Sequence, residues 1–253
     1  MAPRKYHGPL QPGKRSAYVK GLRKKKTSLV SKIKKVSLSQ CETKMSSQRF
    51  WDGTNAQPLL HNQTEYGMHA LLNTTQGTDD PAGTNEDGRN RIGSEIIARG
   101  LLLKFMFISA QSRPNMNIMA YVYQYDATIT AVPTDINFWS GPSGGAGNQN
   151  RFLDRPNGNK VKILRRFLIS NRQNYSSNVP SGSERNNTCY KELYLPLKNK
   201  KIKYIENAAG ASTATPQWKN YGVAIVAFDT TNTLPSDIVG YVTAQTTLYF
   251  KDP

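Results

Sequence analysis

The stretch VGYVTAQTTLYFK, residues 239–251, decides the fold. In an extended chain, one face of this stretch carries Val242, Ala244, Leu248 and Phe250, and the other carries Tyr241, Thr243, Gln245 and Tyr249. Alternation of apolar with polar or aromatic side chains at a period of two is typical of a β-strand that buries one face. The sequence therefore predicts a half-buried strand at this end of the chain.

Similar runs rich in β-branched and aromatic residues recur upstream, separated by clusters of Gly, Pro, Asn and Asp. The predicted strands are 62–74, 95–109, 116–126, 159–171, 188–198, 201–206, 219–229 and 239–251. Pro196 has no N–H to donate, so its strand is expected at a sheet edge. No stretch of ordinary helix length has an apolar period of 3.6. Eight strands with long, uneven connections favour an all-β fold, a single antiparallel jelly-roll β-sandwich rather than an up-and-down barrel.

Charge divides the chain into two predicted parts. Residues 1–44 contain thirteen Lys and Arg but one acid, Glu42, for a net charge of +12, whereas residues 45–253 have a net charge of +5. The first part has too little apolar surface to fold alone, so we expect a flexible arm, followed by a shell domain at 45–253. Leu29, Ile33 and Val36 recur at helical spacing, which leaves a short basic helix open as an alternative for that segment.

A concentrated positive charge indicates a polyanionic partner. The residues predicted to bind nucleic acid are Arg4, Lys5, Lys14, Arg15, Lys20, Arg23, Lys24, Lys25, Lys26, Lys32, Lys34, Lys35, Arg49 and Trp51. The run also matches a bipartite nuclear-import pattern formed by Lys14, Arg15, Arg23, Lys24, Lys25 and Lys26. A solvated tail is the alternative for the arm, and packing against the core or a subunit contact is the alternative for the pair formed by Phe50 and Trp51.

Two further segments carry hypotheses. Lys162, Arg165, Arg166 and Arg172 give the strand at 159–171 a basic face, which would line an inner wall or remain solvated. The insertion at 127–158 is long for a compact domain, so we expect a helical turn at 136–139 and subunit contacts through Phe138, Trp139 and residues 141–158.

Other functions lack support in the sequence. There is no phosphate-binding loop and no nucleophile elbow, and the scattered histidines His7, His61 and His69 have no cysteine partners at ligand spacing. We therefore expect no enzymatic activity, no cofactor and no metal site. The carboxylates at 79–87 match no calcium loop. Cys41 and Cys189 are expected as reduced thiols, and no stretch is apolar enough for a secretory signal or a membrane span.

Five stretches together resemble the capsid proteins of small circular Rep-encoding single-stranded DNA viruses, the group that contains geminiviruses and circoviruses. They are RIGSEI at 91–96, LLLKFMF at 101–107, VKILRRF at 161–167, YKELYLPL at 190–197 and KKIKY at 200–204. The resemblance covers nearly the whole chain and rests on the order and spacing of loose motifs. It implies a single jelly roll that assembles into a small icosahedral shell of about 60 copies around circular single-stranded DNA.

From this resemblance we expect a virion protein that visits the host nucleus during assembly, with a host import receptor as a further partner and no membrane partner. Two alternatives stay open. The first is the coat of a small RNA or satellite virus, whose domain is similar. The second is a cellular β-sandwich that binds nucleic acid and has a regulatory basic tail.

Overall fold

A computed structural model describes residues 29, 32, 33, 36, 41, 43–51, 56–75, 90–110, 116–127, 138–140, 150–170, 188–205, 213–229 and 234–252. The chain divides into two compact units, residues 1–41 and 42–253. In the smaller unit, Leu29, Lys32, Ile33 and Val36 are helical and exposed, in agreement with their helical spacing. No helix among the described residues is long and apolar enough to cross a membrane.

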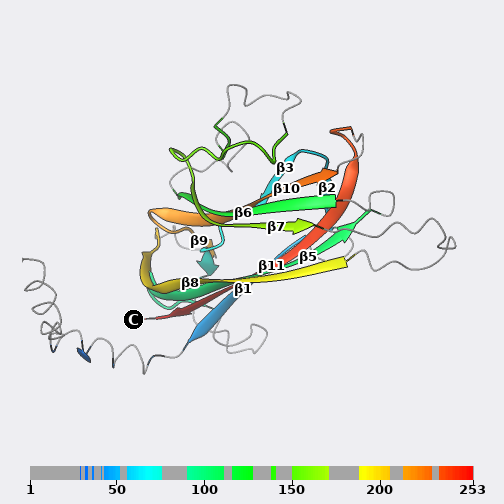
Figure 1. Ribbon diagram of the computed structural model, residues 1–253. Coiled ribbons are helices and arrows are strands. Elements are labelled where there is room, and N and C mark those ends of the chain that lie inside the picture. Colours follow the sequence, from blue (N-terminus) through cyan, green and yellow to red (C-terminus); the bar gives the residue numbers. More distant parts are fainter. Residues whose placement is uncertain are drawn as a thin grey trace, which may run out of the picture. The chain divides into compact units, whose positions relative to one another are not determined.

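The larger unit is built from antiparallel strands (Figure 1). They are β1 (Lys44–Phe50), β2 (Gln57–Leu60), β3 (Thr64–Met68), β4 (Thr74–Thr75), β5 (Glu95–Ser109), β6 (Met116–Asp126), β7 (Lys162–Ser170), β8 (Thr188–Lys203), β9 (Thr213–Ala214), β10 (Lys219–Asp229) and β11 (Ile238–Lys251).

Eight of these strands form two sheets that face each other. The β1 sheet has the order β1-β11-β5-β8, with β2 added on β11, and the β3 sheet has the order β3-β10-β6-β7. The pairing is nested: the first of the eight strands pairs with the eighth, the second with the seventh, the third with the sixth and the fourth with the fifth. This is the connectivity of a jelly roll, so the predicted fold class is confirmed.

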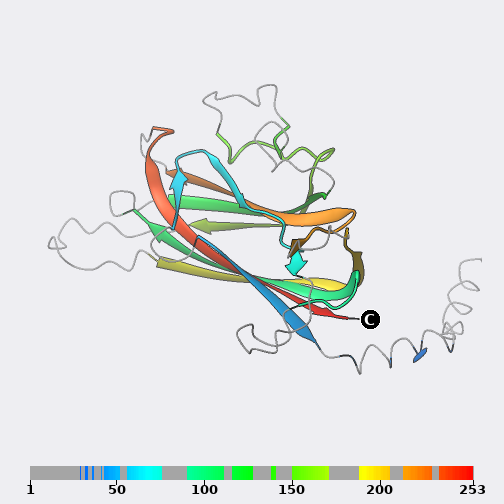
Figure 2. The same cartoon turned by 180° about the vertical axis from the view of Figure 1, so that it is seen from behind.

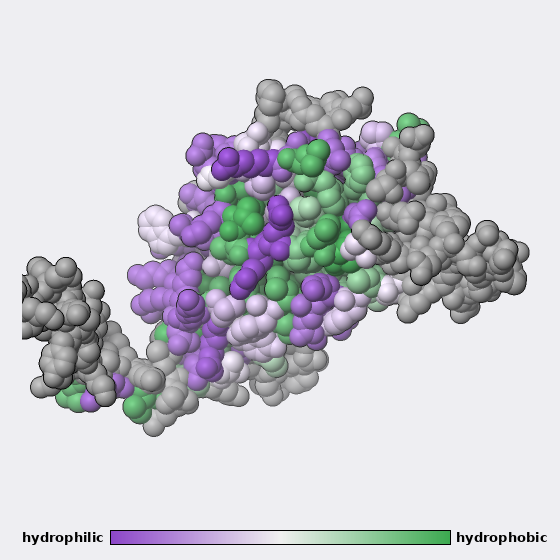
Figure 3. Space-filling view, in the orientation of Figure 1, coloured by the Kyte–Doolittle hydropathy of each residue, from purple (hydrophilic) through white to green (hydrophobic). Residues whose placement is uncertain are grey.

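The main core lies between the two sheets. Alternate residues of β5 and β11 point inward, including Leu103, Phe105 and Phe107 on β5 and Val242 and Phe250 on β11. The alternation predicted for residues 239–251 is therefore present. Edge strands β7 and β8 close one side of the sandwich incompletely, and Figure 3 shows apolar and hydrophilic side chains interleaved on the side where these strands lie. Phe167 and Leu193 pack against the core there but remain partly exposed.

Several strand assignments from the sequence were wrong, and the short strands β2 and β9 were not predicted. β1 was missed because KMSSQRF carries few apolar residues. The strand expected at 62–74 is β3 and β4 with a turn between them, in which Ala70 has a φ of 58°. The strands expected at 188–198 and 201–206 are one strand, β8, interrupted by a bulge where Lys198 and Asn199 have φ values of 54° and 58°. A bulge bends a strand without ending its ladder. Pro196 does lie on an edge strand, as expected.

Candidate nucleic-acid interface

The outer face of the β3 sheet is covered by the chain itself. Residues 138–140 and 150–161, the covering segment, lie on it (Figures 1 and 2). Phe138 packs edge-on against Tyr121 and Tyr123 at centroid distances of 5.9 and 5.2 Å. Trp139 donates from Nε1 to Thr64 Oγ1 at 3.1 Å. A second apolar cluster therefore fills the space between this sheet and the covering segment.

The covering segment corrects one prediction. Phe138 and Trp139 are 0% and 3% exposed within a single chain, so they are not available as subunit contacts. Burial of the aromatic side chains on this outer face stabilises the domain, and here the same chain provides the cover. Of the helical turn expected at 136–139, the structure describes Phe138, which is helical, and Trp139, which bridges to Pro156. Residues 141–149 lie outside the described part of the chain.

The outer face of the β1 sheet has no such cover. No described segment of the larger unit crosses it (Figures 1 and 2). We call this surface the open face. Its members on the four neighbouring strands are Met45, Ser47 and Arg49 on β1, Tyr241, Thr243, Gln245, Thr247 and Tyr249 on β11, Arg99, Leu102, Lys104, Met106 and Ile108 on β5, and Tyr190, Glu192 and Tyr194 on β8. The open face is therefore a mixture of tyrosines, cations and small polar groups.

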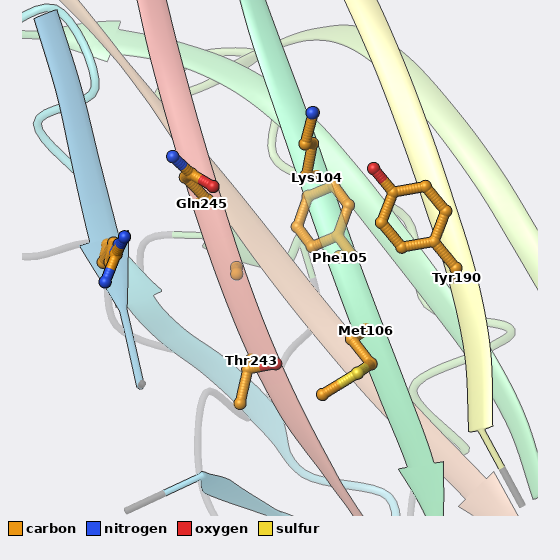
Figure 4. Close-up of a pocket in the computed structure, with 8 residues that line it drawn as sticks. Lys104, Phe105, Met106, Tyr190, Thr243 and Gln245 are labelled. Carbon is orange, nitrogen blue, oxygen red and sulfur yellow. The ribbon is translucent and has the colours of Figure 1, made fainter. Parts of the chain in front are cut away.

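Two shallow depressions lie side by side on the open face. One, of about 340 Å³, is lined by Arg49, Lys104, Met106, Tyr190 and Gln245 among others. Figure 4 shows its labelled side chains on three adjacent strands: Gln245 and Thr243 on β11, Lys104 and Met106 on β5, and Tyr190 on β8. The second, of about 490 Å³, is lined by Thr43, Arg99, Leu102, Glu192, Tyr194 and Tyr249.

Tyr194 has an unusual position in the second depression. Its ring lies over Gly100 of the neighbouring strand, where a Cβ would overlap the tyrosine hydroxyl and come within 2.6 Å of Cε2. Gly100 is also the register partner of Tyr249 on β11, and the two tyrosine rings are 6.5 Å apart between centroids. An aromatic side chain that lies over a glycine in this way protects the exposed backbone and is restrained by it. Tyr194 nevertheless remains 50% exposed.

Positive charge predominates on this side of the β1 sheet. At the end of β8, Lys201 and Lys203 follow the bulge and extend the open face, and Lys201 contacts Glu95 at 2.6 Å between Nζ and Oε1. With Arg49, Arg99 and Lys104 this makes five cations against two carboxylates, Glu95 and Glu192. Glu192 accepts a hydrogen bond from the Tyr190 hydroxyl at 3.0 Å and lies 4.0 Å from Lys104 Nζ. Partial desolvation and this carboxylate raise the pKa of Tyr190.

The predicted nucleic-acid residues fall in three places. Those of the arm other than Lys32 lie outside the described residues, as does the whole import pattern. Lys32 is helical and exposed, and Arg49 lies on the open face. Trp51 packs against the main core, where its Cζ2 would lie 2.9 Å from a Cβ on Gly67. Its position matches core packing, one of the two alternatives to base stacking for the pair that it forms with Phe50.

The basic strand predicted to line an inner wall is β7, which belongs to the β3 sheet. Arg166 pairs in register with Tyr121 and interacts with its hydroxyl on the covered side. The outer faces of the two sheets point in opposite directions, so Arg166 cannot act on the same ligand surface as Arg49. Arg172 lies outside the described residues.

Histidines and carboxylates form no cluster of metal-ligand type in the part of the chain that the structure describes. His61 is buried, packs against Phe228 with the two rings tilted by 38°, and accepts a hydrogen bond from the Asp229 N–H at 3.2 Å. His69 contacts the Gly67 carbonyl at 3.1 Å. Both therefore have structural roles, while His7 and the carboxylates at 79–87 lie outside the described residues.

Sequence reasoning missed Tyr190, Tyr194 and Tyr249 as members of one surface. The alternation on β11 did place Tyr249 opposite the core-facing residues, and the same alternation on β8 applies to Tyr190 and Tyr194. What the pattern could not supply was the strand order, which puts β8 beside β5 and β5 beside β11.

Comparisons with known proteins add little to this geometry. No family model matches the chain, and no curated protein matches it. Among solved structures, one of Desmodium yellow mottle tymovirus aligns over 84% of this chain and 89% of that chain with 12% identity and a TM-score of 0.30. VP1 of Trichodysplasia spinulosa-associated polyomavirus, in complex with GM1 oligosaccharide, aligns over 82% and 76% with 10% identity and a TM-score of 0.12. At such TM-scores neither likeness carries weight, and the fold assignment rests on the strand order.

Proposed function

We propose that the protein is the coat protein of a small non-enveloped virus, whose copies close into an icosahedral shell around a single-stranded genome. The observation that carries the proposal is the joining of a +12 segment to a jelly-roll domain with a net charge of only +5. A charged segment of this kind costs self-repulsion unless a polyanion neutralises it. A jelly roll supplies a compact building block whose edges and loops are free for contacts between copies.

The amount of charge supports a genome as the polyanion. A shell of about 60 identical subunits, the smallest icosahedral closure, would enclose on the order of 700 arm charges. These would neutralise a comparable number of phosphates through counterion release, which does not depend on sequence. We propose DNA as the cargo and nuclear assembly as its setting, because of the import pattern between Lys14 and Lys26 and the resemblance noted above.

The arm joins the domain next to β1, so the two parts can be separated by truncation. Residues 1–41 hold twelve of the thirteen basic side chains of the arm, and β1 starts only at Lys44. Deleting residues 1–41 should leave the β-sandwich folded and remove most of the packaged nucleic acid. The absorbance ratio at 260 and 280 nm of purified particles measures this loss, and unchanged packaging would contradict the role of the arm.

Assembly itself is tested by electron microscopy of the protein expressed alone. Closed particles of uniform size are expected, and nuclease treatment of their extracted contents identifies DNA or RNA. A soluble monomer or dimer with a preference for particular sequences would instead favour the cellular β-sandwich.

A further inference from the structure

We propose that the open face of the β1 sheet is a second nucleic-acid site, where Tyr194 and Tyr249 stack on unpaired bases and Arg49, Arg99 and Lys104 contact the backbone. The proposal rests on the proposed function for its ligand, a single-stranded genome. It differs from that function in assigning base contacts to the folded domain, whereas the arm supplies charge alone.

The first argument is the exposure of aromatic rings on a sheet that lacks a cover. Tyr190 and Tyr194 are 58% and 50% exposed, although tyrosines on the other sheet, such as Tyr121 and Tyr123, are buried by the covering segment. Exposed rings on a β-sheet are a common platform for single strands, because every unpaired base offers a flat face for stacking.

The second argument is that the Tyr194 ring is restrained in its position before any base binds. Its ring lies over Gly100, where there is no Cβ to displace it, and Tyr249 stands beside it at 6.5 Å. A ring that is already restrained loses little conformational entropy when a base stacks on it. The two rings are inclined by 54°, so they are not stacked face to face on each other, and Tyr194 is 50% exposed.

The third argument is charge. Arg99 lines the same depression as Tyr194 and Tyr249, and Arg49 and Lys104 line the neighbouring one. Cations beside aromatic rings suit a single strand, whose phosphates and bases can then each be contacted. A duplex offers no base faces, so the open face should favour single strands over duplex.

The test uses the full-length protein and a photo-crosslinking oligothymidylate of about 16 nucleotides that contains 5-bromodeoxyuridine. Mass spectrometry should locate crosslinks in β8 and β11, at or beside Tyr194 and Tyr249. Binding is measured by fluorescence anisotropy at about 0.5 M salt, because the salt-dependent contribution of the arm falls steeply with ionic strength.

Substitutions separate stacking from folding. The double variant Tyr194→Leu, Tyr249→Leu should bind about tenfold or more weakly at high salt, since each stacked base contributes about 1–3 kcal/mol. Tyr194→Phe, Tyr249→Phe should keep the affinity of the natural protein. Trp218→Leu is the matched control, because Trp218 is 67% exposed but lies just before β10, outside the open face.

The outcomes distinguish this proposal from the proposed function. If the double leucine variant still forms particles but binds the oligonucleotide more weakly, the result supports both proposals. Crosslinks confined to residues 1–41 would overturn the base-stacking site while leaving a coat protein in place. Crosslinks at Tyr194 in a protein that forms no particles would support the site and contradict the coat function. Equal binding of duplex and single strand would also overturn the base-stacking site. An oligouridylate tested in parallel shows whether the site accepts RNA.

Discussion

The two outer faces of the sandwich carry similar side chains, but those of one face are buried and those of the other are exposed. Tyr121, Tyr123 and Tyr125 on β6 include rings that face outward from the β3 sheet, and the covering segment buries them. Tyr190 and Tyr194 on β8 face outward from the β1 sheet and stay exposed. Strand periodicity is the same in both sheets. The difference shows that an outward tyrosine is buried or stays exposed according to whether a distant segment returns to cover it.

The largest expected effect is the difference in lost folding stability between a variant of the covered face and a variant of the open face. Phe138→Ala should destabilise the domain by about 3–5 kcal/mol, because it empties the centre of the cluster between β6 and the covering segment. Tyr190→Ala should change stability by only about 0.5 kcal/mol, since its ring is largely in water. Urea unfolding of both variants measures the contrast, and similar losses at the two positions would remove the distinction between a covered and an open face.

Alkaline pH should affect the covered face. Burial raises the pKa of Tyr123 strongly, so the folded state holds this proton more tightly than the unfolded state does. The corresponding stability is complete below pH 10 and is lost as the pH rises above the unfolded pKa of about 10. Tyr123→Phe should therefore reduce the decline in stability above pH 10.

The alkaline decline should persist in part in that variant. Burial also raises the pKa of Tyr204 to about 12, and Tyr204 donates a hydrogen bond to the Leu72 carbonyl at 2.8 Å. Urea titrations between about pH 9 and 12 follow the effect, with Tyr194→Phe as the control for removing a tyrosine hydroxyl from the open face. An undiminished slope in Tyr123→Phe would contradict a buried, protonated Tyr123.

Local sequence patterns predicted much of the fold but little of the site. Alternation in 239–251 and the neighbouring runs identified the all-β class, and Pro196 identified an edge strand, because both depend on short-range geometry. β1 escaped notice because an edge strand with polar side chains has weak alternation. The open face could not be predicted, since it depends on which strands become neighbours and on the absence of a cover, both of which are long-range properties.

A smaller effect tests how the open face positions Tyr194. Gly100→Ala would place a Cβ where the Tyr194 ring now lies, so the ring must move. Oligothymidylate binding at high salt should weaken about tenfold, which corresponds to the loss of one stacked base. In a Tyr194→Leu background the same change should add almost nothing, because coupled positions are not additive. Fully additive losses would mean that Gly100 acts independently of the ring.

The smallest expected effect distinguishes the cations of the two faces. Arg49→Gln should leave the fold intact and reduce the slope of log affinity against log salt by about one, the contribution of one phosphate contact. Arg166→Gln serves as the matched control, because Arg166 interacts with Tyr121 on the covered side of the sandwich and should leave the slope unchanged. Each variant removes one positive charge from an exposed side chain on a strand of the same domain. A difference between their salt slopes therefore reflects which face carries the charge and not the net charge of the protein. Equal slopes for the two variants would mean that the nucleic acid senses only the overall charge of the protein, and the open face would then have no role of its own in binding.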